Sequence, residues 1–333
     1  MRKGVRGNNI LRLEDERYKS DNTGKFDRSE SLRKWLEKNS RSMNSEEKRV
    51  VGLLLGGESE KLEGLRKISS MEIRLPIDIV SAFLYDESEK IRLGALETLL
   101  ALGKISDISR VIELASDPSE RVREKACSLL GYGGKESVSV LIDALMDGNV
   151  KVRRAAACSL ERCVHENMAQ IDIKRIVANL DDCDDEVCEY ISRSLKRIGK
   201  ASVPALVSMV LSAEIPSQRK MLEVLSSFED TRCREIFRMF VSDSDRIARE
   251  HAANGLLKIA ENRDIEALVE VFSSDRKKID TFVDMLLKLP GKGIKELESC
   301  LNSVNPNSRA FAIMCLSRLG EYRHGEVDTE ICD

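Results

Sequence analysis

Cysteines and a histidine in the middle of this sequence are the residues best suited to metal binding or nucleophilic chemistry. Cys158 and Cys163 are followed by a second pair with the same spacing, Cys183 and Cys188, and His165 lies between the two pairs. Zinc sites favour Cys-x2-Cys turns in which two thiolates converge, whereas side chains five residues apart on one helix diverge by about 140°. We therefore expect small buried helix residues here, with no metal and no cofactor.

An acidic run and a glycine-rich segment suggest two other kinds of binding. Residues 181–186 could bind a hard cation, but they lack the glycine and the terminal glutamate of an EF-hand loop, and carboxylates also gather at helix N-termini as caps. Residues 131–135 lack the spacing of a phosphate-binding loop and are typical of a helix end. With three histidines in the whole chain, the sequence predicts no catalytic residue.

The composition narrows the class of protein. The 333 residues are 42% hydrophobic, 33% charged and 4% aromatic, which fits a globular chain and disfavours aromatic platforms that stack nucleic-acid bases. The longest uncharged run, residues 201–213, is too short to span a bilayer, and no signal peptide is visible at the N-terminus. Nine scattered cysteines predict free thiols in a reducing compartment, so we expect the cytoplasm, or the nucleus in a eukaryote.

A repeat of about 30 residues runs through most of the chain. Apolar residues recur at positions 0, +4 and +8 of an amphipathic helix, and position +4 is often alanine, which lets neighbouring helices approach closely. A shorter apolar helix precedes each copy, and no stretch shows sustained strand alternation. The nine residues at position zero are Leu62, Ile91, Val122, Val152, Val187, Gln218, Ala248, Ile279 and Ser308.

The repeat predicts an all-α fold, an α-solenoid of about nine helix pairs over residues 45–320. A unit of this length cannot bury its own apolar face, so neighbouring units must stack. Residues 1–44 form a basic segment that we expect to be disordered to about residue 28, with a short amphipathic helix at 29–38. That helix either caps the first unit or binds a partner in trans. Residues 321–333 form a short acidic tail.

Aspartate and arginine recur with fixed spacing around the start of each second helix. The arginine stands one residue after position zero and six residues after the aspartate, but Glu63, Cys188 and Asp280 replace it in three copies. Together with the small residue that follows, this pattern resembles HEAT repeats, in particular the short HEAT-like units of the bilin-lyase (phycobilisome lyase) type. The resemblance implies a hydrogen-bonded ladder between successive units, formed by Asp86, Arg92, Asp117, Arg123, Asp147, Arg153, Asp243 and Arg249.

Enzymes among the HEAT-like families provide alternatives. Deoxyhypusine hydroxylases bind two irons through repeated His-Glu pairs, and this chain has one such pair, at His165. For a bilin lyase we find no separate catalytic signature beyond the repeat. HEAT-like DNA glycosylases use aromatic residues near the damaged base, and the single tryptophan, Trp35, precedes the repeats. An enzyme or enzyme accessory of the lyase or hydroxylase type remains the alternative to a non-enzymatic scaffold.

Two sets of residues on the second helices could bind a partner. An apolar set at positions +3 and +6 would line the concave side of a solenoid and suit a partner helix or extended segment, although the same positions could form the edge of the core. A basic set on the same face favours an acidic protein segment, with a nucleic acid ranking after it. The apolar set is Tyr190, Met221, Phe282, Met285, Phe311 and Met314; the basic set is Arg154, Arg162, Arg193, Lys196, Arg197 and Lys220.

The sequence therefore predicts a scaffold or adaptor that holds a protein partner along the concave face.

Overall fold

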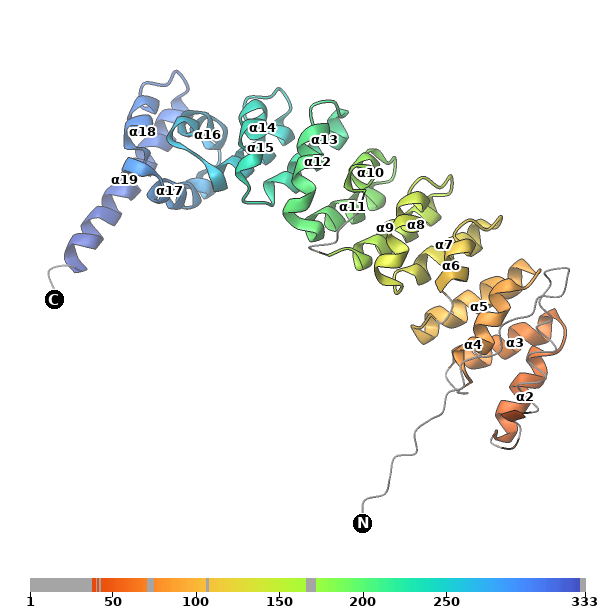
Figure 1. Ribbon diagram of the computed structural model, residues 1–333. Helices are drawn as coiled ribbons and strands as arrows, with labels where there is room; N and C mark the ends of the chain where they lie inside the picture. Colours follow the sequence, from red (N-terminus) through yellow and green to blue (C-terminus); the bar gives the residue numbers. More distant parts are fainter. Residues whose placement is uncertain are drawn as a thin grey trace, which may run out of the picture. The chain divides into compact units, whose positions relative to one another are not determined.

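The computed structural model describes residues 38–39, 41, 43–70, 75–105, 108–165 and 172–329, and throughout these ranges the regular structure is helical. The predicted helix at 29–38 lies outside the described residues, apart from its last residue. The chain divides into two compact units, the first ending at Cys163 and the second beginning at Val164. Each unit is described by itself below, with the helix labels of Figure 1.

The first unit contains four helix pairs in the described residues, which we number as repeats 1 to 4 (Figure 1). The first helix of repeat 2 continues into the 3₁₀ helix η2 (Ala82–Tyr85), and that of repeat 4 follows the 3₁₀ helix η3 (Gly134–Ser137). The pairs are α2 (Ser45–Leu54) with α3 (Glu58–Ser69), α4 (Ile77–Ser81) with α5 (Glu89–Leu102), α6 (Ile108–Leu114) with α7 (Glu120–Leu130), and α8 (Val138–Ala144) with α9 (Val150–Cys163).

The second unit contains five further pairs, repeats 5 to 9, and 3₁₀ turns connect many of its helices. The last helix runs on to Thr329, so most of the predicted acidic tail continues a helix of the last repeat. The pairs are α10 (Ile173–Ala178) with α11 (Asp185–Ile198), α12 (Val203–Met209) with α13 (Ile215–Ser226), α14 (Arg234–Phe240) with α15 (Arg246–Ile259), α16 (Ile265–Phe272) with α17 (Ile279–Lys288), and α18 (Ile294–Cys300) with α19 (Pro306–Thr329).

The helices stack as the periodicity predicts. Within each unit the second helix of a repeat packs on the second helix of the next one, as α3, α5, α7 and α9 do in the first unit and α11, α13, α15, α17 and α19 do in the second. Position zero and the small residue at +4 face this contact: Ile91, Ala95, Val122 and Ala126 are all buried. The prediction of an all-α solenoid of nine helix pairs is therefore confirmed for the described residues.

Side chains in the turns define where the second helices begin. The carboxylate of Asp117 accepts a hydrogen bond from the backbone N–H of Ser119 at 2.9 Å, and Asp147 does the same for Asn149 at 2.8 Å. The same hydrogen bond, from the backbone N–H two residues later to the aspartate carboxylate, forms at Asp86, Asp182 and Asp243. Each aspartate thus tightens the turn before the helix, as short polar side chains do by bonding nearby backbone groups.

A glycine in repeat 7 permits an unusually close contact between the two helices of that repeat. A Cβ added at Gly255 on α15 would lie 2.4 Å from the Cζ atom of Phe237 on α14. Phe237 is fully buried, so its ring lies directly on the backbone of α15. Across the described residues, no helix combines the length and the apolar character needed to cross a membrane.

Candidate functional site

The arginine–aspartate ladder is present in the first unit with a regular geometry. Arg92 on α5 donates from Nε and Nη2 to the two carboxylate oxygens of Asp117, at 2.9 and 3.0 Å. Arg123 on α7 makes the same paired contact with Asp147, at 2.7 and 3.0 Å. The third nitrogen, Nη1, donates to backbone carbonyls of the arginine's own turn, such as that of Asp117 for Arg123, at 2.9 Å. Each guanidinium therefore ties its own turn to the turn of the next repeat.

The ladder residues are mostly shielded from solvent, which strengthens their pairing. Hydrogen bonding from Arg123 holds the pKa of Asp147 below its usual value, and the carboxylate in turn raises the pKa of Arg123. A bidentate, charge-assisted pair of this kind is both stronger and more directional than a neutral hydrogen bond. These residues thus stabilise the stack, and their donors and acceptors are already used.

Two features of the ladder escaped the sequence pattern. In repeat 1, where Glu63 replaces the arginine, Lys61 forms the ion pair with Asp86 at 3.1 Å. A second ladder runs beside the first, because polar residues that begin the second helices donate to a glutamate of the preceding repeat. Its contacts are Ser88 to Glu58 at 2.8 Å, Ser119 to Glu89 at 2.6 Å and Asn149 to Glu120 at 2.6 Å.

At two further members the arginine keeps the Nη1 contact with its own turn. Arg153 donates from Nη1 to the carbonyl of Asp147 at 3.0 Å, and Arg249 likewise to that of Asp243 at 2.6 Å. Arg219, which the pattern left without an aspartate, binds the two oxygens of Asp245 at 2.6 and 2.9 Å. The acceptor for Arg219 is therefore Asp245 and not Asp243, the residue that the repeat pattern indicates.

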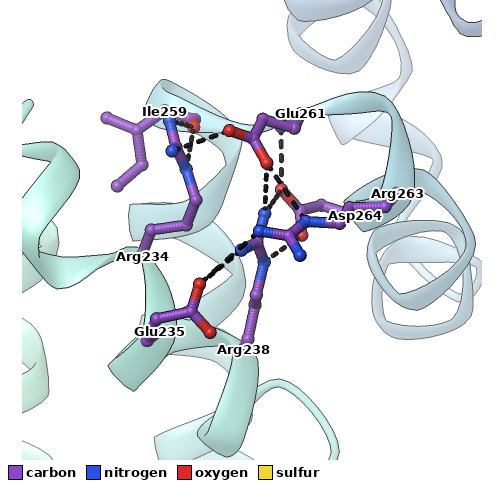
Figure 2. A network of polar contacts seen from close by, with 7 residues as sticks. All are labelled: Arg234, Glu235, Arg238, Ile259, Glu261, Arg263 and Asp264. Carbon is purple, nitrogen blue, oxygen red and sulfur yellow. Dashed lines mark hydrogen bonds and ion pairs between the residues drawn. The ribbon is translucent and has the colours of Figure 1, made fainter.

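A dense polar network joins repeats 7 and 8 on the side of their first helices (Figure 2). Arg238 on α14 donates to both oxygens of the buried Asp264, at 2.6 and 3.0 Å, and to Glu261 at 2.8 Å. Arg234 donates to the carbonyl of Ile259 at 3.1 and 3.0 Å. Glu235 and Arg263 complete the network, which balances three cations with three carboxylates, so we assign it to stability. The sequence offered only a cluster of opposite charges as a signal.

The predicted apolar partner surface is wrong for four of its six residues. Met221, Phe282, Met285 and Phe311 are buried, with 3%, 0%, 6% and 0% of their surface exposed, while Tyr190 and Met314 are partly buried. The Phe282 ring packs edge-on against Phe311 at 5.3 Å and against Phe272 at 6.4 Å. Neighbouring helices cover position +3 fully at Met221, Phe282 and Phe311 but only in part at Tyr190.

The predicted basic stretch is on the surface but is divided between the two units. Arg154 and Arg162 are exposed on α9 of the first unit, and the other four residues belong to the second. The guanidinium of Arg162 lies 5.8 Å from the ring centre of Tyr132.

The four basic residues of the second unit lie on α11 and α13. Arg193, Lys196 and Arg197 are exposed along the last two turns of α11, and Lys220 on α13 is partly exposed. Arg193 pairs with Glu189 one turn earlier, and Lys196 pairs with Glu223 on α13 at 2.8 Å. These side chains project from a helix whose opposite face, including Val187, Ile191 and Leu195, is buried.

Of the four cysteines predicted to be small buried helix residues, Cys163 and Cys188 are buried and Cys158 is partly buried, but the prediction is wrong for Cys183, which is exposed in the turn before α11. Burial raises the pKa of the Cys163 and Cys188 thiols, which disfavours the reactive thiolate. In the acidic run, the carboxylate of Asp184 accepts from the N–H of Val187 at 3.2 Å, as a helix cap does. No group of three or more His, Cys, Asp or Glu side chains that could hold a metal occurs among the residues that the structure describes.

Comparison with known proteins identifies the repeat. A family model for HEAT repeats matches residues 77–161 and 108–196. The chain therefore contains HEAT repeats over residues 77–196, and helix pairs precede and follow this range. No curated protein matches the chain.

Two solved structures resemble the chain at low identity. One is the crystal structure of an engineered protein, 14% identical, with a TM-score of 0.33 over 83% of this chain and 98% of that one. The other is the complex of CpcE and CpcF of phycocyanin lyase from Nostoc sp. PCC7120, 18% identical, with a TM-score of 0.36 over 74% of this chain and 95% of that one. Neither likeness adds to the assignment made by the family model.

Proposed function

We propose that this HEAT-repeat protein is a non-enzymatic scaffold that binds an acidic protein segment through the second unit. The observation that carries the proposal is the row of exposed cations on α11, formed by Arg193, Lys196 and Arg197. Most of the apolar residues that the sequence suggests for partner binding are core residues, so the charged surface is the better candidate. A stack of repeats offers an extended surface rather than an enclosed pocket, which suits a long ligand.

The existing ion pairs on this surface are easily exchanged for a partner. The Arg193 and Glu189 side chains are 49% and 59% exposed, and those of Lys196 and Glu223 are 37% and 38% exposed. Exposed pairs of this kind contribute only about 0–1 kcal/mol. A segment that brings several carboxylates at once can replace them at little cost. Arg197 has no ion-pair partner among the described residues, so its charge is available without any exchange.

An acidic protein segment is favoured over a nucleic acid. Proteins that bind single-stranded nucleic acid commonly stack bases on aromatic side chains, whereas 4% of this chain is aromatic. The partly exposed Tyr190 is the one aromatic residue of α11. Carboxylates on a flexible segment need no stacking and pair directly with lysine and arginine side chains.

The proposal is tested by fluorescence anisotropy with a labelled, end-blocked peptide rich in Asp and Glu. Replacing Arg193, Lys196 and Arg197 with glutamine should weaken binding by about tenfold or more, which corresponds to about 1.4 kcal/mol or more. A matched control removes three exposed cations of the first unit, Lys104, Lys135 and Lys151, and should change the affinity little.

Two outcomes contradict the proposal. Equal losses in the two triple variants would mean that only the net charge matters. Tighter binding of a single-stranded oligonucleotide than of the peptide, lost in the α11 variant, would assign the surface to nucleic acid instead.

A further inference from the structure

Arg249, near the start of α15, makes only one of the two sets of contacts that a ladder arginine makes: it binds its own turn but not the turn of the next repeat. Its Nη1 donates to the backbone carbonyls of Asp243 and Ser244 at 2.6 and 2.9 Å. In Arg123 the Nε and Nη2 atoms then donate to both oxygens of an aspartate in the next turn. Among the described residues, the corresponding two nitrogens of Arg249 have no acceptor. These two donors, Nε and Nη2 of Arg249, are called the Arg249 fork below, and they have no acceptor in repeat 8.

The turn between α16 and α17, which would be expected to supply the acceptor for Arg249, has a different backbone conformation from the regular turns. The spacing of the pattern would put Ser274 at the ladder position, but the backbone puts Asp275 there, since its N–H donates to the carbonyl of Phe272 as that of Asp147 does to Ala144. The carboxylate of Asp275 accepts from the N–H of Lys277 at 3.1 Å and forms no hydrogen bond or ion pair with Arg249. The chain then winds through the 3₁₀ helix η8 (Arg276–Lys278), and α17 begins at Ile279, four residues after the aspartate. In the regular repeats the helix begins three residues after it. Asp275 is accordingly exposed.

The other irregular repeats show how this chain handles a missing ladder contact. In repeat 5, Cys188 replaces the arginine. In the next turn Ser212 takes the aspartate position, since its N–H donates to the carbonyl of Met209 as that of Asp147 does to Ala144. In repeat 8, Asp280 replaces the arginine, and Ser303 takes the position in the next turn. In these two repeats arginine and aspartate are absent together, whereas repeat 7 keeps Arg249 although the next turn supplies no acceptor for it. Leaving charged donors unpaired in a partly buried place is costly, so the exception points to an acceptor from outside the chain.

A cavity lies beside the open fork. It has a volume of about 510 Å³ and is lined by Arg249 and Arg246, by apolar residues of α16, and by three carboxylates. Each carboxylate is already engaged: Asp243 with the N–H of Asp245 at 2.7 Å, Glu250 with Arg246 at 2.9 Å, and Glu270 with residues of repeat 9 at 2.9 and 3.0 Å. Of the two arginines that line the cavity, Arg249 is the one without an ion-pair partner among the described residues.

We propose that the Arg249 fork binds the side-chain carboxylate of an aspartate from a partner's protein segment. The aspartate takes the place that Asp147 takes on Arg123, with two parallel charge-assisted hydrogen bonds. The cavity exceeds the size of one carboxylate and admits the residues on either side of it. This site deepens the proposed function and rests on it for the choice of a protein ligand, but it lies on repeats 7 and 8 rather than on α11.

The test uses nuclear magnetic resonance of the full chain labelled with ¹⁵N-arginine, observing the side-chain Nε–H signals. The probe is N-acetyl-aspartate N-methylamide, and its uncharged match is the asparagine analogue at the same ionic strength. The Arg249 signal is identified by its absence in Arg249→Lys. It should shift with the aspartate probe and not with the asparagine probe, while the signals of Arg92 and Arg123 stay in place.

Three results would overturn the proposal. The first is an Arg249 signal that does not respond to the aspartate probe. The second is a response that appears only in Asp275→Asn, since Asp275 would then fill the fork in solution. The third is a larger shift with N-acetylglycine, which would assign the site to a chain-terminal carboxylate. The α11 triple variant should keep the Arg249 response, so failure of the α11 proposal and failure of this one are distinguishable.

Discussion

Replacing Asp147 with asparagine removes one charge from the ladder and hardly changes the shape of the side chain. Asp147 accepts from Arg123 Nε at 2.7 Å and Nη2 at 3.0 Å, and from the N–H of Asn149 at 2.8 Å. In the variant, Oδ1 can keep its contacts with Arg123 Nη2 and Asn149, while an NH2 group faces Arg123 Nε. One donor of the guanidinium then loses its acceptor.

The magnitude follows from the burial of the pair. The Arg123 and Asp147 side chains are 20% and 12% exposed, so water replaces the lost acceptor poorly. A hydrogen bond to a charged group contributes about 1.5–3 kcal/mol, and an unpaired buried charge costs about 3–5 kcal/mol. For this partly buried pair we expect a loss of about 2–4 kcal/mol in the free energy of unfolding, measured by urea denaturation followed by circular dichroism.

The loss should depend on pH in a defined direction. Arg123 lowers the pKa of Asp147 in the folded state, so the stabilisation is fully present above the unfolded value of about 3.9 and disappears as the pH falls through the folded value. The difference between wild type and Asp147→Asn should therefore be constant near neutral pH and shrink below about pH 4.

The matched control is Glu113→Gln, which removes a carboxylate from an exposed ion pair in the same unit. Glu113 pairs with Arg110 and its side chain is 61% exposed, so we expect a loss below about 1 kcal/mol. Equal losses in Asp147→Asn and Glu113→Gln, or a difference that persists at acid pH, would refute the ladder as a stabilising element.

Three further predictions concern the core and the thiols. Phe282→Ala, at a fully buried ring, should lower the free energy of unfolding by about 3–5 kcal/mol. A loss below about 1 kcal/mol would mean that Phe282 lies on the surface and not in the core. Gly255→Ala should destabilise by about 1–3 kcal/mol because its Cβ meets Phe237, whereas Gly52→Ala, with open space around it, should stabilise by about 0.5–1 kcal/mol; the same sign in both denaturation curves would contradict the close contact. The exposed Cys183 should react with a thiol reagent before Cys127, since burial of Cys127 raises its pKa to about 12, and mass spectrometry of the labelled peptides would reveal a reversed order.

The sequence was sufficient for the helix pairs, because their stacking depends on residues such as Val122 and Ala126 that recur with a helical period. The sequence was not sufficient to predict whether the side chains at position +3 face solvent or the core. Periodicity identifies a helical face but not the number of neighbours that cover it, so Phe282 and Phe311 looked available for a partner.

The polar contacts divide in the same way. The aspartate–arginine spacing predicted that Arg92 and Arg123 would join neighbouring turns, because identical repeats place them in identical surroundings. Contacts in irregular repeats, such as Arg219 with Asp245 and Arg238 with Asp264, depend on local shifts of the backbone. The spacing of residues in a single sequence does not predict such shifts of the backbone.

Photo-crosslinking is the measurement that tests most directly whether the cations of α11 receive an acidic segment. A short, end-blocked Asp/Glu-rich peptide carrying one photoreactive residue is irradiated with the full chain, and the crosslinked sites are mapped by mass spectrometry. The account predicts that crosslinks concentrate on residues beside Arg193, Lys196 and Arg197 and on the facing part of α13, and that excess unlabelled peptide removes them. Crosslinks spread over both units, or concentrated on helices of the first unit, would contradict it.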